Sequence, residues 1–177
     1  MRAELEVDLG RPLPKDHVTR CGEELFGLFR RELKPVAGIA GVITPIAAWG
    51  HACCIASSSS PGRIVVALDT TGLHGFFRSN VFSSTMVARG KPAPDLFLHA
   101  ARTMGFAPES CIIVEDSPNG IRAARSAGIR SLGFLGGIHC PAGHREALMS
   151  VGADRVCADS SELAPAVAEE LGIPPPT

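Results

Sequence analysis

Apolar positions along the chain change from helical spacing to short continuous runs and back again. Within residues 1–34, apolar side chains recur on one face of a helical pattern, with charged side chains elsewhere. After this segment the pattern predicts helices over residues 36–49, 61–71, 94–104, 118–127, 143–150 and 161–171. It predicts strands over residues 52–56, 80–82, 111–114, 130–134 and 154–157. Strands that alternate with helices of this length indicate an α/β fold with a parallel sheet.

The run from Pro35 to Gly62 contains no charged side chain apart from His51, which raises the alternative of a membrane helix. Glycines, Pro45 and four serines interrupt it, and no stretch reaches the roughly 18 apolar residues that a spanning helix needs. We therefore predict a core helix followed by a core strand. Pro45 in the middle of that helix would cost about 3 kcal/mol.

Two adjacent carboxylates, Glu115 and Asp116, follow the predicted strand 111–114. In a parallel α/β sheet, ligands bind at the carboxyl ends of the strands. Paired carboxylates repel one another unless a cation or a shared proton relieves them, and hard oxygen ligands suit Mg²⁺. The alternative is a solvated turn in which an aspartate or a serine caps the next helix.

Two other segments carry candidate phosphate ligands. Serines at positions 57–60 follow strand 52–56, and Pro61 is suited to open the next helix, whose amino end can hold a phosphate. Lys91 lies in the sequence GKPAPD, where the prolines would hold it on a stiff, extended backbone and aim its ammonium inward. The alternatives are a serine-rich loop that only caps a helix and a solvated lysine.

These three segments, with VEDSPNGIRAARSAG around the carboxylates, resemble the second, third and fourth motifs of the haloacid dehalogenase superfamily. The closest resemblance is to its phosphatases and β-phosphoglucomutases with a helical cap, and it runs from about residue 8 to residue 170. It implies a Rossmann-like parallel sheet and Mg²⁺-dependent phosphoryl transfer from a small phosphorylated metabolite, such as a sugar phosphate. Enzymes of this family attack phosphorus with an aspartate, and a second aspartate two residues later acts as general acid and base.

The resemblance also implies roles for individual residues. Ser57 and Ser58 would bind the phosphoryl group, and Lys91 would neutralise its charge, so that Ser57 and Lys91 serve catalysis. Glu115 and Asp116 would position Mg²⁺, directly or through water.

The first motif of the family, which carries both catalytic aspartates, is missing, because no D-x-D occurs in the sequence. Residues 1–34 resemble the second half of the cap, so we expect a cap remnant there. Residues 35–177 would then form a core that lacks its first strand, as in a truncated chain. Asp69 follows an apolar run, but the family has a helix at this place, and the pattern predicts one that ends at Gly72.

Without the nucleophile strand, we expect little or no turnover. The alternative is a non-catalytic remnant or a module that binds phosphate and Mg²⁺. Strands 52–56 and 111–114 would lie about 10 Å apart, because neighbouring strands are spaced by about 4.8 Å. Their unpaired backbone groups would cost about 1–3 kcal/mol each. We therefore expect marginal stability and self-association through these edges, unless the strands collapse together or another chain supplies a strand.

Composition narrows the function classes further. The chain is 45% hydrophobic and 20% charged, with a net charge of −1 and no basic stripe, which argues against nucleic acid as a partner. The cysteines lack zinc or redox spacing and several lie in predicted strands, which indicates reduced core thiols of a cytoplasmic protein. His139, Cys140 and His144 could suggest a metal site, but the stretch is more typical of a loop that leads into a helix.

Overall fold

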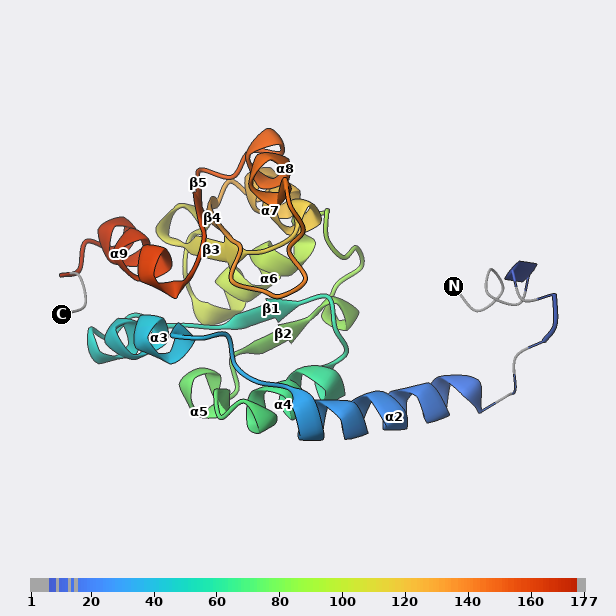
Figure 1. Cartoon of the computed structure of the whole chain (residues 1–177). Coiled ribbons are helices and arrows are strands. Elements are labelled where there is room, and N and C mark those ends of the chain that lie inside the picture. Colours follow the sequence, from blue (N-terminus) through green and yellow to red (C-terminus); the bar gives the residue numbers. More distant parts are fainter. Residues whose placement is uncertain (1–6, 9, 13, 15, 175–177) are drawn as a thin grey trace.

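A computed structural model describes residues 7, 8, 10–12, 14 and 16–174 of this chain. In this part of the chain the strands form two separate parallel sheets (Figure 1). In the first, β1 (Ile55–Ser57) pairs with β2 (Val81–Ser83). In the second, β4 (Arg130–Phe134) lies between β3 (Ile112–Glu115) and β5 (Arg155–Cys157). The predicted α/β class and its parallel strands are confirmed.

Helices connect and cover the strands, and their limits differ from the predicted ones by no more than three residues. They are α3 (Ile39–Ala48), α4 (Pro61–Thr70), α6 (Asp95–Met104), α7 (Pro118–Ser126), α8 (His144–Ser150) and α9 (Ser160–Leu171). The sequence pattern missed the one-turn helix α5 (His74–Phe77) and two 3₁₀ turns at residues 84–86 and 108–110. Such short elements contain too few residues for a helical period to show.

Part of the core lies on the two faces of the second sheet, and other buried clusters pack against the first. Cys157 packs with residues of α3 and α9 on one face, whereas the preceding residue, Val156, packs with α7 and α8 on the other. This alternation is the ordinary strand pattern in which successive side chains point to opposite faces. Both faces of β5 are therefore covered by helices.

Helix α3 forms in spite of Pro45, which lies inside it. Its apolar side holds Val42 and Ile43, both buried, against α9 and α5. Burying each of these side chains contributes about 1.5–3 kcal/mol, which offsets the cost of about 3 kcal/mol for the proline. None of the helices described here is both long enough and apolar enough to span a bilayer.

The amino-terminal helix α2 (His17–Glu32) runs along α4 and extends beyond the rest of the molecule (Figure 1). It contacts α4 through Arg63, whose guanidinium lies 5.9 Å from the centre of the Phe29 ring. Leu28 is half-exposed on this helix. The division into a cap remnant at residues 1–34 and a core at 35–177 stays a prediction, and residues 1–6, 9, 13 and 15 lie outside the described part.

A cleft separates the two sheets. Among the described strands, β1 pairs only with β2, and β3 pairs only with β4. A cavity of about 450 Å³ lies between β1 and β3, and both strands line it. The predicted gap in the sheet is therefore present, and the two strands have not collapsed onto one another.

The expectation that the cysteines are core thiols is wrong for most of them. Only Cys157 is buried, whereas Cys53, Cys54 and Cys111 are partly exposed because they line the cleft. Partial burial, with Cys53 and Cys111 nearby, raises the pKa of the Cys54 thiol to about 11. All three thiols are thus uncharged at neutral pH, since burial raises the pKa of Cys53 and Cys111 as well.

Candidate functional site

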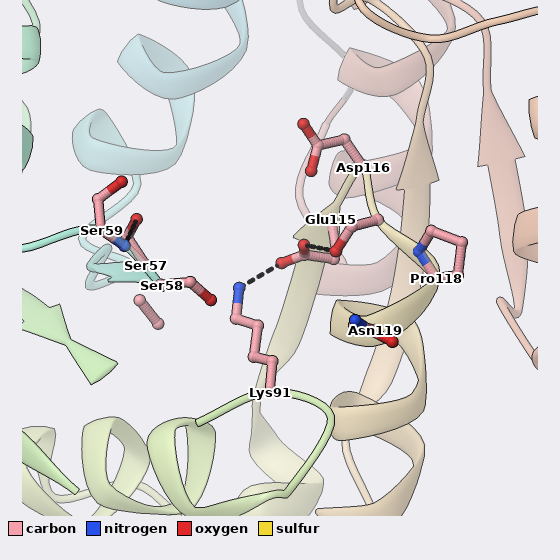
Figure 2. Close-up of a pocket in the computed structure, with 10 residues that line it drawn as sticks. Ser57, Ser58, Ser59, Lys91, Glu115, Asp116, Pro118 and Asn119 are labelled. Atoms are coloured by element: carbon pink, nitrogen blue, oxygen red, sulfur yellow. Dashed lines mark hydrogen bonds and ion pairs between the residues drawn. The ribbon is translucent and has the colours of Figure 1, made fainter. Parts of the chain in front are cut away.

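A pocket of about 540 Å³ opens where the carboxyl ends of β1 and β3 approach each other. Figure 2 shows the side chains that surround it. The structure brings together all five residues that the sequence singled out. The lining consists of Ala56, Ser57, Ser58, Ser59, Lys91, Glu115, Asp116, Ser117, Pro118 and Asn119.

Lys91 and Glu115 form the buried ion pair of this pocket. The Lys91 Nζ lies 2.7 Å from Glu115 Oε2, and the two side chains are only 8% and 10% exposed. The ammonium also lies 4.8 Å from the centre of the Phe97 ring, in the range of a cation–π contact. Lys91 therefore points inward as predicted, although residues 91 and 92 form a turn rather than an extended segment.

Glu115 is held in place from the other side by the start of α7. The Ser117 hydroxyl donates to Glu115 Oε1 at 2.7 Å and accepts from the Gly120 N–H at 3.0 Å. Ser117 is therefore the helix cap that was the alternative interpretation of this turn, and it also orients the carboxylate. Gly120 leaves the space that Glu115 fills, because a Cβ at this position would overlap the Glu115 side chain.

Asp116 presents the more accessible carboxylate, with its side chain 44% exposed. Its Oδ2 lies 3.0 Å from His139 Nε2, and its backbone carbonyl lies 2.6 Å from His144 Nε2. The stretch around these histidines is a loop that leads into α8, as predicted, but its folding back onto Asp116 was missed. No sequence signal marks this contact, because His139 is separated from Asp116 by a whole α–β unit.

The serine loop, residues 57–60, is held in place by hydrogen bonds from the end of β2 and the residue that follows it. The Ser83 hydroxyl donates to the Ser59 carbonyl at 2.7 Å, and the Ser84 hydroxyl donates to the Ser58 carbonyl at 3.0 Å. Within the loop, Ser57 Oγ accepts from the Ser59 N–H at 3.1 Å. The Ser57 hydroxyl hydrogen remains able to donate to a ligand, since this bond uses only an oxygen lone pair. Ser83 and Ser84 carry no signal in the sequence that marks this role.

Replacing Ser83 with alanine is expected to lower the free energy of unfolding by about 1–3 kcal/mol, because the Ser59 carbonyl then loses a donor inside the protein. Ser83 is completely buried and also accepts from the Thr85 N–H. Urea unfolding followed by circular dichroism measures the change. Ser84→Ala is the matched control, since its hydrogen bond is exposed and its loss should cost less. Equal effects of the two substitutions would contradict the assignment.

The arrangement can hold an anion and a cation side by side. Figure 2 shows the serine loop on one side of the pocket and the two carboxylates on another, with the Lys91 ammonium between them and paired with Glu115. Described groups of three or more histidine, cysteine or acidic side chains that could enclose a metal by themselves are absent. Asp69 does not belong to the site, because it lies within α4 and pairs with His74 at 2.5 Å. The prediction of a helix there is confirmed.

Comparison with known proteins identifies relatives of this arrangement. The family model for haloacid dehalogenase-like hydrolases matches residues 3–128. The β-phosphoglucomutase of Mycobacterium bovis is 35% identical over 147 residues, which cover 80% of this chain and 50% of that protein. The 6-phosphogluconate phosphatase of Escherichia coli is 29% identical over 124 residues, covering 70% of this chain and 54% of that protein. This chain therefore spans about half the length of both enzymes.

A solved structure is similar over almost the whole chain. It is a haloacid dehalogenase family hydrolase from Deinococcus radiodurans with bound phosphate and sodium. The TM-score is 0.79 at 30% sequence identity, and the match covers 98% of this chain and 76% of that one. The two chains therefore share the arrangement of their helices and strands.

Proposed function

Because this chain belongs to the haloacid dehalogenase-like hydrolases, we propose that its pocket binds the phosphoryl group of a small phosphorylated metabolite together with Mg²⁺. The site would serve phosphoryl transfer, with a sugar phosphate as the substrate class. The names of the relatives, a β-phosphoglucomutase and a 6-phosphogluconate phosphatase, support this class. The observation that carries the proposal is the convergence of the serine loop, Lys91 and the two carboxylates on one pocket.

The anion would bind between the serine loop and Lys91. The Ser57 and Ser58 hydroxyls line the pocket on one side, and the Lys91 ammonium points into it from the other (Figure 2). A phosphoryl oxygen would attract Lys91 Nζ, which lies in a buried environment where charge–charge interactions are less screened than in water. Lys91 would then share its charge between Glu115 and the ligand.

The two carboxylates fit Mg²⁺, which usually takes one or two carboxylates, substrate phosphate oxygens and water. Asp116 is the more available donor, because its side chain is 44% exposed and its Oδ2 pairs only with the exposed His139, whereas both Glu115 oxygens have partners in Lys91 and Ser117. Asp116 would hold the ion directly, and Glu115 would act through water or by orienting Lys91. When bound, Mg²⁺ would neutralise negative charge on the phosphoryl group.

We infer that the chain on its own turns over slowly or not at all. Covalent phosphoryl transfer needs a nucleophile that is free to approach phosphorus. Of the residues that line the pocket, the carboxylates are Glu115 and Asp116. Glu115 is held on both oxygens. Asp116 would be engaged by the cation in the proposed site. Because neither pocket carboxylate is free to act as a nucleophile, the second candidate function, a binding module without catalysis, is also favoured.

Isothermal titration calorimetry with inorganic phosphate, in the presence and absence of MgCl₂, tests the proposal. We expect binding that strengthens at least 10-fold with MgCl₂, and Asp116→Asn should remove this gain while leaving a weak phosphate affinity. Asp69→Asn is the control, because Asp69 lies on α4 outside the pocket. Absence of phosphate binding in the folded chain would overturn the proposed site.

Hydrolysis of p-nitrophenyl phosphate with Mg²⁺ separates the enzyme from the binding module. Little or no turnover is the expected result for this chain. Robust turnover that Glu115→Ala abolishes would contradict the inferred inactivity and require another nucleophile in the pocket.

A further inference from the structure

We propose that His139 and His144 position Asp116, the carboxylate that would hold the cation. His144 would fix its backbone, and His139 would fix one of its carboxylate oxygens. This role rests on the proposed function, because it acts on the same cation site. Neither histidine lines the pocket itself, so both would act through Asp116 and not on the phosphoryl group.

The partner atoms decide which ring nitrogen of each histidine carries a hydrogen. His144 Nε2 lies 2.6 Å from the Asp116 carbonyl, and a carbonyl oxygen can only accept. His139 Nε2 lies 3.0 Å from Asp116 Oδ2, and a carboxylate likewise only accepts. Both Nε2 atoms must therefore donate. The two contacts hold whether the rings are neutral or protonated, since Nε2 can carry a hydrogen in both states.

His144 reaches Asp116 from a helix that is firmly packed. It is the first residue of α8, whose Leu148 is completely buried in a cluster with Ile121 of α7. The next residue, Arg145, donates from Nη1 to a backbone carbonyl of β5 at 2.6 Å. A donor on a packed helix holds its acceptor more precisely than a donor on a loop. His144 therefore fixes the peptide group that follows Asp116.

The carbonyl that His144 holds lies between two residues that are fixed in other ways. Before it, the Glu115 carboxylate pairs with Lys91 and accepts from the Ser117 hydroxyl. After it, Ser117 caps α7. The backbone on both sides of Asp116 is therefore held, and His144 completes this support. The side chain of Asp116 still has its own rotatable bonds, which these backbone contacts do not restrict.

His139 restricts that remaining rotation. Because Asp116 Oδ2 accepts from His139, the other oxygen, Oδ1, is left for a cation. The contacts that Asp116 makes with the described residues involve Oδ2 and the backbone carbonyl but not Oδ1. A hydrogen bond to one oxygen orients the other, as the outer partners of metal-binding side chains commonly do.

Gly137 leaves the space in which the His139 ring lies. A Cβ at this position would lie 2.6 Å from Cε1 and 2.8 Å from Nδ1 of the ring, well inside van der Waals contact. Gly137→Ala would therefore push the ring away from Asp116. It would do so without straining the backbone, because Gly137 is not among the glycines with positive φ. The glycine acts here for His139 as Gly120 does for Glu115.

Binding of Mn²⁺ to the full chain, followed by electron paramagnetic resonance of the free ion, tests the role of His144. Mn²⁺ takes the same oxygen ligands as Mg²⁺. His144→Phe keeps a flat ring but removes the donor, and should weaken Mn²⁺ binding at least 10-fold. His144→Gln, whose amide can donate, should recover part of this loss. The affinity for inorganic phosphate without metal should stay unchanged in both variants, whereas general damage to the pocket would lower it.

The same titration tests His139. Gly137→Ala and His139→Ala should each weaken Mn²⁺ binding about 3-fold, the effect of one ordinary hydrogen bond. The loss is smaller than for His144→Phe because the His139 side chain is 63% exposed and water can replace it. His74→Phe is the matched control and should bind Mn²⁺ normally, since His74 pairs with Asp69 outside the pocket.

Normal Mn²⁺ binding by His144→Phe would overturn its positioning role. Tighter binding by His139→Ala would overturn the role of that ring, because His139 would then compete with the cation. Absence of Mn²⁺ binding in the unmodified chain would instead overturn the cation site of the proposed function, and this inference with it. Nitrogen NMR of the unmodified chain gives a test that needs no substitution. A His144 ring with its hydrogen on Nδ1 alone would contradict the assigned hydrogen bond.

Discussion

Replacing Lys91 with methionine is expected to destabilise the folded chain by about 3–5 kcal/mol, the usual effect of removing one partner from a buried ion pair. The Glu115 carboxylate would remain almost fully buried beside an apolar side chain, with only Ser117 as its donor. Methionine keeps most of the lysine volume, so the loss reports the charge rather than a cavity. Urea unfolding monitored by circular dichroism measures it.

Two further variants separate the buried pair from a general effect of charge. Arg89→Met removes an exposed ion pair with Asp95, in which the arginine side chain is 72% exposed, and should cost at most about 1 kcal/mol. The double variant Lys91→Met with Glu115→Gln should recover part of the stability lost in the single variant, because no buried charge is left without a partner. If Lys91→Met costs no more than Arg89→Met, the pair does not stabilise the fold as argued.

The arrangement of the fold could be predicted from the sequence because its signals are local. Apolar runs such as 130–134 are short and flanked by turns, and the structure has β4 over the same residues. The start of β1 was placed three residues too early, at residue 52, because residues 52–54 are apolar and continue the pattern of the strand. Those residues lie beside the cleft and have no strand to pair with on that side.

Those site residues that lie at the ends of strands could be predicted from the sequence. Serines at the end of β1 and carboxylates at the end of β3 approach each other when parallel strands end at the same edge, and the structure places them around one pocket. The residues that hold the site in place through hydrogen bonds could not be predicted in this way. Ser83 and His144 reach the site from other parts of the chain, through contacts that only tertiary packing brings together.

The cleft between β1 and β3 lies where the order of the motifs indicates that a strand is missing. The order of the motifs indicated a gap between two strands, but the residue pattern contained no information on whether the gap would close. The structure keeps it open, with α3 and α6 both lining it. Side chains on these helices leave a cavity of about 450 Å³ between the two strands.

Gly120→Ala is expected to destabilise the chain by about 3 kcal/mol and to weaken phosphate binding with Mg²⁺ at least 10-fold. The new Cβ would occupy the space of the Glu115 side chain, which would have to leave Lys91 and Ser117. Thermal unfolding and calorimetry on the same sample measure both effects.

Gly62→Ala is the matched control near the start of α4, where an added Cβ meets only Phe26 at 3.9 Å. There the substitution should stabilise the helix by up to about 1 kcal/mol, because alanine favours a helix over glycine. A stable Gly120→Ala variant with normal phosphate binding would show that Glu115 does not need the position that Ser117 and Lys91 give it.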